Sequence, residues 1–279
     1  MRPVTTAPAP WSAPLGSCWQ LGPRDMLASG HQVVRRIGGG GTHEVFLVAG
    51  DSLGLAAAKL PRPHLAGNPH CLLGLKNEAR ALELLAQSTV PRHLETVLLG
   101  PHPHLLLEYV PGPTLDEALA TGRPLSPRTV ASLGWSLACT LEHIAAAGWV
   151  HLDVKPSNIV PNARPRLLDF ELAMPAIEAA RLTRPTGSWA FMPPEQRAAG
   201  ASAIGPPADV FALAVSLGEA LVGRPTPSTL PRRSGLPGPV GAVLNEALAP
   251  APSDRPTAAE LGAGLEQHSE PDELLAAAA

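Results

Sequence analysis

The stretch that decides the fold is His151-Leu152-Asp153-Val154-Lys155-Pro156-Ser157-Asn158, followed by Leu167-Leu168-Asp169-Phe170-Glu171. Phosphoryl transfer needs a carboxylate to accept a hydroxyl proton, a cation at the moving phosphate, and oxygen ligands for magnesium. Asp153, Lys155, Asn158 and Asp169 supply these groups within one short segment. The segment therefore indicates a site for phosphate chemistry.

Lysine is rare in this chain, which otherwise uses arginine for its cations. The 21 basic residues include only three lysines, Lys59, Lys76 and Lys155. Lys59 ends an apolar strand-like run, where a cation is costly to bury unless a partner compensates its charge. Glu78, in a helical segment further along, or a phosphate would supply that compensation. Lys155 belongs to the segment quoted above, whereas Lys76 is interpreted as compositional drift.

A glycine-rich stretch precedes Lys59, running Ile37-Gly38-Gly39-Gly40-Gly41-Thr42-His43-Glu44-Val45 between two strand-like runs. Glycines at such a place let backbone N–H groups approach phosphates closely. A run of glycines between strands is also typical of a simple flexible hairpin. Because Lys59 follows on the next predicted strand, we interpret the run as a phosphate-binding loop.

Hydrophobic periodicity divides the chain into two unlike lobes. The first is rich in strands and holds one helix, with strands predicted at 33–37, 44–48, 55–60, 95–99 and 104–110 and the helix at 75–86. The second is mainly helical, with helices predicted between Ser126 and Gly148, at 209–222 and at 257–267. The predicted fold class is α+β, with two lobes joined by a Pro/Gly hinge.

This pattern predicts four parts of the chain. They are a Pro-rich N-terminal tail at 1–30, a first lobe at 31–110, a second lobe at 111–268 and a C-terminal tail at 269–279. Trp11 and Trp19 are the large aromatic residues of the first tail, and we expect them to anchor it on the lobe.

Composition excludes several classes of protein. The chain has 279 residues, of which 45% are apolar, so it can bury a core. Its net charge is −3 and it has no basic stripe, which nucleic-acid binding requires. No uninterrupted apolar run approaches the roughly 18 residues of a membrane helix. Three widely spaced cysteines suggest neither a disulfide framework nor a cysteine-based zinc site. We expect a soluble cytoplasmic protein that binds neither nucleic acid nor membrane.

In order along the chain, these motifs resemble the eukaryotic-type, bacterial-like Ser/Thr protein kinase catalytic domain, from about residue 33 to 268. The resemblance rests on the glycine-rich loop, Lys59, Glu78, a hinge-like Leu107-Glu108-Tyr109-Val110, the segment 151–158, Asp169, the stretch 187–195, Asp209 and Arg255. It implies a bilobal kinase fold and transfer of the ATP γ-phosphate to the hydroxyl groups of proteins.

The resemblance also implies a role for each catalytic residue. Lys59 would hold the α- and β-phosphates and pair with Glu78, Asp153 would orient the acceptor hydroxyl, and Lys155 would touch the γ-phosphate. Asn158 and Asp169 would bind Mg²⁺. Mn²⁺ is a second candidate metal, because Glu171 adds a carboxylate beside Asp169.

Further contacts follow from the same resemblance. The nucleotide-binding positions would be Ile37, Gly38, Gly40, Val45, Ala57, Lys59 and the backbone of Glu108 and Val110, with Leu107 as the gatekeeper. Glu195 and Arg255 would form a buried ion pair beneath the substrate platform, and Ser188 would lie beside Asp153. The expected partners are protein substrates and a regulatory protein.

Four positions depart from the family pattern. His43 replaces the third glycine of the loop, Leu152 the arginine of His-Arg-Asp, Glu171 the glycine of Asp-Phe-Gly, and Pro193 the alanine before Pro194-Glu195. None removes a group that the chemistry needs, so we expect an active kinase. An ATP-binding pseudokinase scaffold and a kinase-fold small-molecule phosphotransferase remain alternatives.

Two smaller expectations concern single residues. Leu152 cannot bind a phosphate, so the segment between Asp169 and Glu195 should fold without phosphorylation, through apolar contacts such as those of Phe170, Trp189 and Phe191. His102 and His104 resemble a metal pair, but no third ligand has suitable spacing, so a metal site there is not expected.

Overall fold

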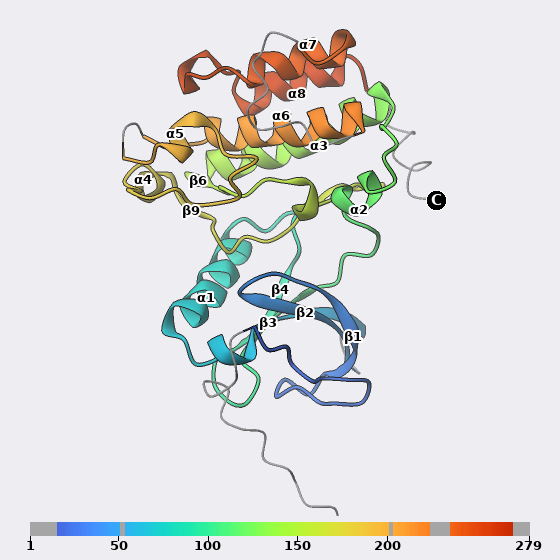
Figure 1. The fold of residues 1–279 in the computed structure, drawn as a ribbon, viewed down its shortest axis with the longest axis vertical. Coiled ribbons are helices and arrows are strands. Elements are labelled where there is room, and N and C mark those ends of the chain that lie inside the picture. The colour runs from blue at the N-terminus through green and yellow to red at the C-terminus, as the bar shows by residue number, and fades with distance from the viewer. Residues whose placement is uncertain (1–15, 51–53, 201–202, 224–234, 270–279) are drawn as a thin grey trace, which may run out of the picture. The chain divides into compact units, whose positions relative to one another are not determined.

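The computed structural model describes residues 16–50, 54–200, 203–223 and 235–269, and the described chain divides into two compact units (Figure 1). One unit holds the described positions up to 84 together with 91–110, and the other holds 85–90 together with those from 111 onward. The predicted tail residues 1–15, including Trp11, and 270–279 lie outside the described residues.

An antiparallel sheet of five strands forms the first unit, in the order β1-β2-β3-β5-β4. The strands are β1 (Gln32–Gly39), β2 (His43–Gly50), β3 (Gly54–Pro61), β4 (His93–Val97) and β5 (His104–Glu108). The first three occur where the sequence predicts them. The fourth ends at Val97 rather than Leu99, and the chain then turns through Gly100, whose φ of 105° favours glycine.

One face of this sheet carries a closed apolar core. Phe46, Val48, Ala58 and Leu60 alternate with residues of the other face along β2 and β3, as the period of two in a strand requires. Residues before the sheet cover this core. Leu27 is buried in it, and Trp19 and Leu21 pack against it, so residues 16–31 form an arm on the sheet.

Helix α1 (Pro69–Leu84) belongs to the same unit and begins six residues before the predicted start at Leu75. Asn68 explains the early start, because its side-chain oxygen accepts the N–H groups of His70 and Cys71 at 2.9 and 3.4 Å. Pro69 then occupies the first helical position, where no N–H is needed. Leu75 and Ala79 of this helix pack on Leu105 of β5. A short turn, η2 (Pro63–Leu65), precedes the helix.

Helices dominate the second unit (Figure 1). They are α2 (Leu115–Leu119), α3 (Pro127–Ala146), α4 (Ala176–Ala179), α5 (Pro194–Arg197), α6 (Pro207–Val222), α7 (Gly238–Ala247) and α8 (Ala258–Glu266), with the turns η3 (Pro156–Asn158) and η4 (Pro252–Asp254). Two small ladders pair β6 (Trp149–Val150) with β9 (Met174–Pro175), and β7 (Ile159–Val160) with β8 (Arg166–Leu167).

Helix α3 is the centre of this unit and contacts α6 and α8. Its start is the predicted one, since the Ser126 hydroxyl accepts the Thr129 N–H at 3.0 Å and Pro127 follows it. A Cβ at Gly134 would lie 2.6 Å from Leu265 and 2.7 Å from Leu217, so glycine is needed where the three helices meet. Within the described ranges, none of the helices combines the length and apolar character needed to cross a bilayer.

Candidate functional site

In the first unit, Lys59 and Glu78 form a buried ion pair. The Lys59 Nζ lies 2.7 Å from Oε2 of Glu78, with the two residues 7% and 1% exposed. Lys59 occupies strand β3 opposite Val45 and Leu105, and Glu78 lies on the inner face of α1. The pairing suggested from the sequence is therefore present, and it holds an ammonium group on the face of the sheet that α1 covers.

The predicted nucleotide-binding residues share this face. Register pairs Val45 with both Gly38 and Lys59, and Ala57 with Leu47 and Leu107, and directly paired residues project to the same side of a sheet. Val45, Ala57 and Leu107 are half-buried, unlike the closed core on the opposite face. The strands thus bring the proposed adenine contacts and the phosphate-binding lysine to one face.

The glycine-rich turn joins β1 to β2 through residues 40–42. The Gly40 N–H donates to the His43 carbonyl at 2.8 Å, which makes the turn tight. Gly39 has φ of 141°, and a Cβ there would lie 2.8 Å from the His43 oxygen, so this position requires glycine. At Gly40 a Cβ would meet nothing within 4 Å, so a ligand has room to approach that backbone.

His43, which replaces the third glycine of the pattern, is 4% exposed. Its Nδ1 lies 3.0 Å from the Thr42 hydroxyl, within the same connection.

The hinge-like stretch ends strand β5. The Glu108 N–H donates to the Arg92 carbonyl at 2.9 Å, and the Glu108 carboxylate accepts the Arg92 N–H at 3.0 Å. This residue is thereby fixed by the chain that leads into strand β4. Ile37 and Val110, the remaining predicted contacts, are both half-buried.

In the second unit, a buried carboxylate binds the backbone at the start of the segment 151–158. Asp209, 3% exposed and in the first turn of α6, accepts the N–H groups of His151 and Leu152 at 2.7 and 2.8 Å. Leu152 has φ of 67°, so its backbone is strained. Burial raises the pKa of the Asp209 carboxyl, while the two backbone N–H groups, and the His151 ring whenever it is protonated, oppose that rise.

His151 has a structural role in this network. Its Nδ1 accepts the Asp153 N–H at 3.3 Å, so its Nε2 carries the proton and donates to the Leu168 carbonyl at 3.2 Å. The ring also contacts the Phe170 ring edge-on, with centroids 4.7 Å apart. The imidazole is therefore packed and hydrogen-bonded at both nitrogens.

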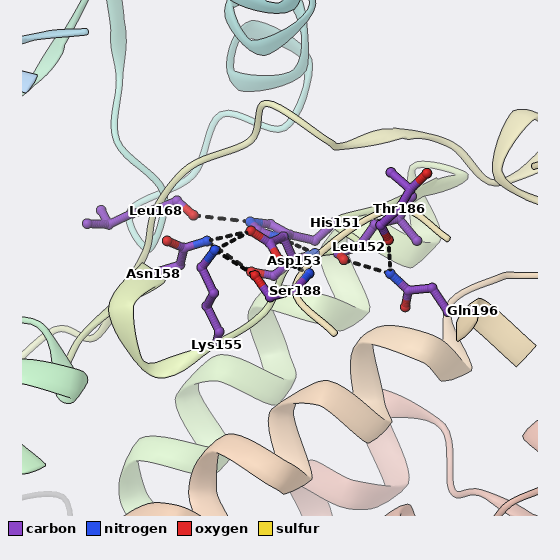
Figure 2. A network of polar contacts seen from close by, with 9 residues as sticks. All are labelled: His151, Leu152, Asp153, Lys155, Asn158, Leu168, Thr186, Ser188 and Gln196. Atoms are coloured by element: carbon purple, nitrogen blue, oxygen red, sulfur yellow. Dashed lines mark hydrogen bonds and ion pairs between the residues drawn. The ribbon is translucent and has the colours of Figure 1, made fainter. Parts of the chain in front are cut away.

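Asp153 is the centre of the polar network in Figure 2. Its Oδ1 accepts the Ser188 N–H at 2.8 Å, and its Oδ2 lies 2.6 Å from the Lys155 Nζ. Lys155 also donates to the Ser188 hydroxyl at 2.8 Å. The carboxylate is 8% exposed and held in one orientation by a backbone N–H and an ammonium group. Oδ2 also accepts a longer hydrogen bond from Asn158 Nδ2 at 3.4 Å, so Oδ1 is the oxygen that retains a lone pair for a further hydrogen bond.

Asn158 offers one ligand atom for a metal. Its Nδ2 donates to the Asp153 carbonyl at 2.9 Å, which fixes the amide so that Oδ1 faces away from that carbonyl. Asp169, the second predicted ligand, is half-buried and has φ of 64°. Amide and carboxylate oxygens suit Mg²⁺, so these two residues fit the proposed metal. Among the described residues, no cluster of three or more His, Cys, Asp and Glu side chains forms a further metal site.

Gln196, which was not anticipated from the sequence, ties the segment after Asp169 to residues 151–158, the predicted catalytic loop. Its side-chain amide donates to the Leu152 carbonyl at 2.9 Å and also to the Thr186 carbonyl. Gly187 has φ of 116°, and a Cβ there would collide with the Leu152 carbonyl oxygen. A glutamine beside Glu195 gives no sequence signal of its own, because its partners are backbone carbonyls brought together only by folding.

Leu152 itself is 3% exposed in an apolar cluster with Val150, Ala179, Ile204 and Ala208. Met174 and Leu182 pack against this cluster, so it joins the segment after Asp169 to the catalytic loop. The aromatic support expected from the sequence is present only in part. Phe170 is fully buried, but Trp189 is 58% exposed, with the Arg197 guanidinium 5.4 Å from its ring centroid. The expectation that Trp189 packs the segment is therefore wrong.

Glu195 and Arg255 form the buried ion pair that the resemblance implied. The guanidinium Nη1 and Nη2 contact the two carboxylate oxygens at 2.6 and 2.8 Å. Its remaining N–H groups donate to the carbonyls of Ala249, Pro207 and Pro250 at 2.7 to 2.9 Å. All five donors are satisfied, as burial requires.

His102 and His104 do not form a metal site. His104 is fully buried, with Nδ1 2.8 Å from the His102 carbonyl and Nε2 2.8 Å from the Ser29 hydroxyl. Both of its ring nitrogens are therefore occupied by protein groups.

A comparison with protein families decides the class: the model described as "Protein kinase domain" matches residues 31–263. The chain belongs to the protein kinase domain family. Its curated relatives are bacterial serine/threonine-protein kinases, so it is a bacterial-type Ser/Thr kinase domain. The probable serine/threonine-protein kinase PkwA of Thermomonospora curvata is 31% identical over 198 residues, covering 70% of this chain and 26% of PkwA.

The second relative is the serine/threonine-protein kinase PknK of Mycobacterium tuberculosis. It is 32% identical over 272 residues, covering 87% of this chain and 24% of PknK. The chain thus spans about a quarter of the length of these two relatives. Among solved structures, the Mycobacterium tuberculosis PknI kinase domain aligns with a TM-score of 0.67 and 22% identity, over 90% of this chain and 100% of that one. This likeness confirms the bilobal α+β kinase fold.

Proposed function

We propose that this chain is an active kinase that transfers the γ-phosphate of ATP to serine or threonine hydroxyls of proteins, with Mg²⁺ or Mn²⁺ bound. The observation that carries this proposal is the position of Asp153, whose carboxylate is fixed by the Ser188 N–H and the Lys155 ammonium. A general base has to be held in one orientation toward the proton it accepts, and these two contacts hold the carboxylate in that way.

Asp153, Lys155 and Ser188 each have a task in the phosphoryl transfer. Asp153 accepts the hydrogen bond of the substrate hydroxyl and takes its proton as the oxygen attacks phosphorus. Lys155, within 2.6 Å of that carboxylate, balances the charge that builds up on the transferring oxygens. Ser188 keeps both in register, because its N–H binds the carboxylate and its hydroxyl binds the ammonium.

The residues that would bind the nucleotide lie in the first unit. Lys59, held by Glu78, would bind the α- and β-phosphates, and the N–H groups of the glycine-rich turn would contact the phosphate oxygens. Val45 and Ala57 would contact the adenine on the same sheet face. Asn158 Oδ1 and the Asp169 carboxylate would hold Mg²⁺, which would neutralise phosphate charge.

None of the four departures from the family pattern removes a part of this machinery. Leu152 belongs to an apolar cluster, and Pro193 precedes α5 at its N-cap. His43 lies in the turn region and Glu171 next to Asp169, so these two act on rate or metal preference rather than on the presence of the site.

The test is incorporation of radiolabelled γ-phosphate from ATP into the protein itself and into a generic basic protein, with Asp153→Asn as the control. Incorporation by the wild type that is lost in Asp153→Asn supports the proposal. Binding of MgATP without any incorporation identifies a pseudokinase scaffold instead. Phosphorylation of a small metabolite but of no protein identifies the small-molecule phosphotransferase.

A further inference from the structure

Arg62, at the end of strand β3, holds the glycine-rich turn from one side. Its backbone N–H donates to the Thr42 carbonyl at 2.8 Å, and its Nε donates to the Gly40 carbonyl, also at 2.8 Å. One residue therefore fixes two carbonyl oxygens of a turn that contains only residues 40–42. Neither bond was anticipated from the sequence, because Arg62 lies in no recognised motif.

These bonds set the direction of the amide groups in the turn. A trans peptide is planar, so the Gly41 N–H points opposite to the Gly40 carbonyl that Arg62 holds. Glycine lies on both sides of this peptide, and glycine adopts positive and negative φ with similar ease. Without a partner, the peptide could therefore turn its carbonyl instead of its N–H toward a phosphate. Arg62 removes that choice.

The guanidinium of Arg62 is itself held by the N-terminal arm. Its Nη1 lies 3.3 and 3.4 Å from the carbonyl oxygens of Gly16 and Ser17, and 3.2 Å from the Cys18 sulfur. A guanidinium carries donors in a rigid fork, so Nη1 can bind the arm while Nε binds the turn. The side chain thus bridges residues 16–18 and Gly40.

Trp19 fastens the arm to the residues that flank the turn. Its indole N–H donates to the Pro61 carbonyl at 2.8 Å, and its backbone N–H donates to Glu44 Oε2 at 2.8 Å. Glu44 is fully buried in β2, and its other oxygen pairs with Arg36 Nε at 2.9 Å. Pro61 directly precedes Arg62, so the arm is seated at the base of the bridge.

We propose that Arg62 is a positioning residue for the phosphate-binding turn, and that arm residues 16–19 keep its guanidinium in place. This inference rests on the proposed function, because the turn matters only if it contacts the phosphates of ATP. In this role Arg62 does not contact the nucleotide. It acts by orienting the Gly40–Gly41 peptide so that the N–H faces the phosphates.

The first experiment measures steady-state kinetics of Arg62→Ala. We expect the KM for ATP to rise about tenfold, the order of magnitude for losing one hydrogen bond to a charged group. The kcat should stay within about threefold, since uniform binding is lost and the reacting groups in the second unit are untouched. Arg62→Lys should recover only part of the affinity, because an ammonium on a flexible stem does not reproduce the fork.

Two further variants test the bridge. Trp19→Phe keeps an aromatic side chain of smaller size and removes the indole N–H to Pro61, so it should raise the KM for ATP less than Arg62→Ala does, by about threefold for one neutral hydrogen bond. Arg35→Ala removes an exposed arginine of strand β1, the strand that leads into the glycine-rich turn, and serves as the matched control. It should leave both constants unchanged.

Amide hydrogen exchange in the nucleotide-free protein gives a readout that does not depend on activity. Arg62→Ala should speed exchange at residues 40–43 and leave the Asp153 segment unchanged. Unaltered exchange there, together with an unaltered KM in an active enzyme, would overturn the inference. A parallel fall of kcat, ATP affinity and melting temperature would also overturn it, since that pattern means general destabilisation. If the wild type shows no turnover, the proposed function fails, whereas the exchange result still decides how the turn is held.

Discussion

The catalytic loop and the glycine-rich turn are held by opposite chemistry. Around the catalytic loop, the fully buried Asp209 carboxylate accepts two backbone N–H groups, so an acceptor fixes donors. At the glycine-rich turn, the half-buried Arg62 guanidinium donates to a backbone carbonyl, so a donor fixes an acceptor.

The two anchors also differ in how strongly they hold. Asp209 belongs to a long buried helix, and Gln196, Ser188 and the Leu152 cluster hold the same loop from other sides. Arg62 depends on an arm of the chain and on contacts of 3.2 to 3.4 Å. The backbone beside Asp153 is therefore held from several sides, whereas the glycine-rich turn depends on fewer and longer contacts.

The largest effect should come from the rigid region. Asp153→Asn keeps the size and most contacts of the side chain but cannot accept a proton, so the rate should fall about 10²–10⁴-fold. The affinity for MgATP, measured by titration with a fluorescent ATP analogue, should change little because the phosphate grip is unaltered. Retained turnover in this variant would remove the assignment of Asp153.

The next effect concerns the stability of the second unit. Arg255→Met leaves Glu195 buried without its bidentate partner, which should cost about 3–5 kcal/mol of unfolding free energy. The matched control is Arg92→Ala, whose exposed pair with Glu108 spans 3.7 Å and should cost less than about 1 kcal/mol. Urea denaturation measures both.

A double variant sharpens this measurement. Glu195→Leu combined with Arg255→Met removes both charges, so much of the lost stability should return. A single variant as stable as the wild type would show that the buried pair is not what supports this region.

How much the sequence could predict differs between the same two regions. The catalytic residues were predicted because their chemistry needs particular residue types at fixed spacing, as in 151–158. The Lys59–Glu78 pair followed from the cost of burying a cation at the end of a strand. Arg62, Glu44 and Gln196 were missed because their partners are backbone atoms or distant residues, and a backbone carbonyl has no signature in a sequence.

Some misses had a readable cause. The early start of α1 was encoded in Asn68-Pro69, a capping residue followed by proline, but the apolar pattern alone indicated Leu75. The exposed Trp189 could not be anticipated, because an aromatic residue beside a catalytic segment is as easily packed as presented to solvent.

A smaller effect should appear where the arm meets the sheet. His104 Nδ1 faces the His102 carbonyl and so carries the proton, which leaves Nε2 to accept the Ser29 hydroxyl; His31 Nδ1 contacts the same hydroxyl at 3.1 Å. Burial lowers the pKa of His104, with the charge of His31 acting in the same direction and Glu95 and the His102 carbonyl opposing it. The folded state therefore favours neutral His104.

The sign of the pH dependence follows directly. A lowered folded-state pKa gives stability that is complete above the unfolded value of about 6.5 and is lost as pH falls below it. As the pH falls below about 6.5, the wild type should lose more stability than His104→Gln, which keeps a donor and an acceptor without titrating. Thermal melts at several pH values measure this, with the exposed His70→Gln as control. Parallel melting profiles for wild type and His104→Gln would contradict the argument.

The smallest expected effect is that of phosphorylation on the segment between Asp169 and Glu195. A segment that needs a phosphate to become ordered must hold a cation ready for it, and here the position next to His151 carries Leu152 in a closed apolar cluster. Gln196 and Ser188 then fix the segment through hydrogen bonds that need no added charge. Thr183 and Thr186 remain candidate phosphosites, with Arg181 and Arg184 exposed beside them.

We therefore expect phosphatase-treated protein and the Thr183→Ala/Thr186→Ala double variant to keep the substrate turnover of untreated wild type within about threefold, because no charge-assisted bond to a phosphate is available at Leu152. All three should be assayed at the same ATP concentration, with mass spectrometry to confirm that the phosphate is absent. A tenfold or larger drop in either would mean that a local arginine reads the phosphate after all. The apolar cluster around Leu152 would then hold the segment both with and without the phosphate, and phosphorylation would still control the turnover.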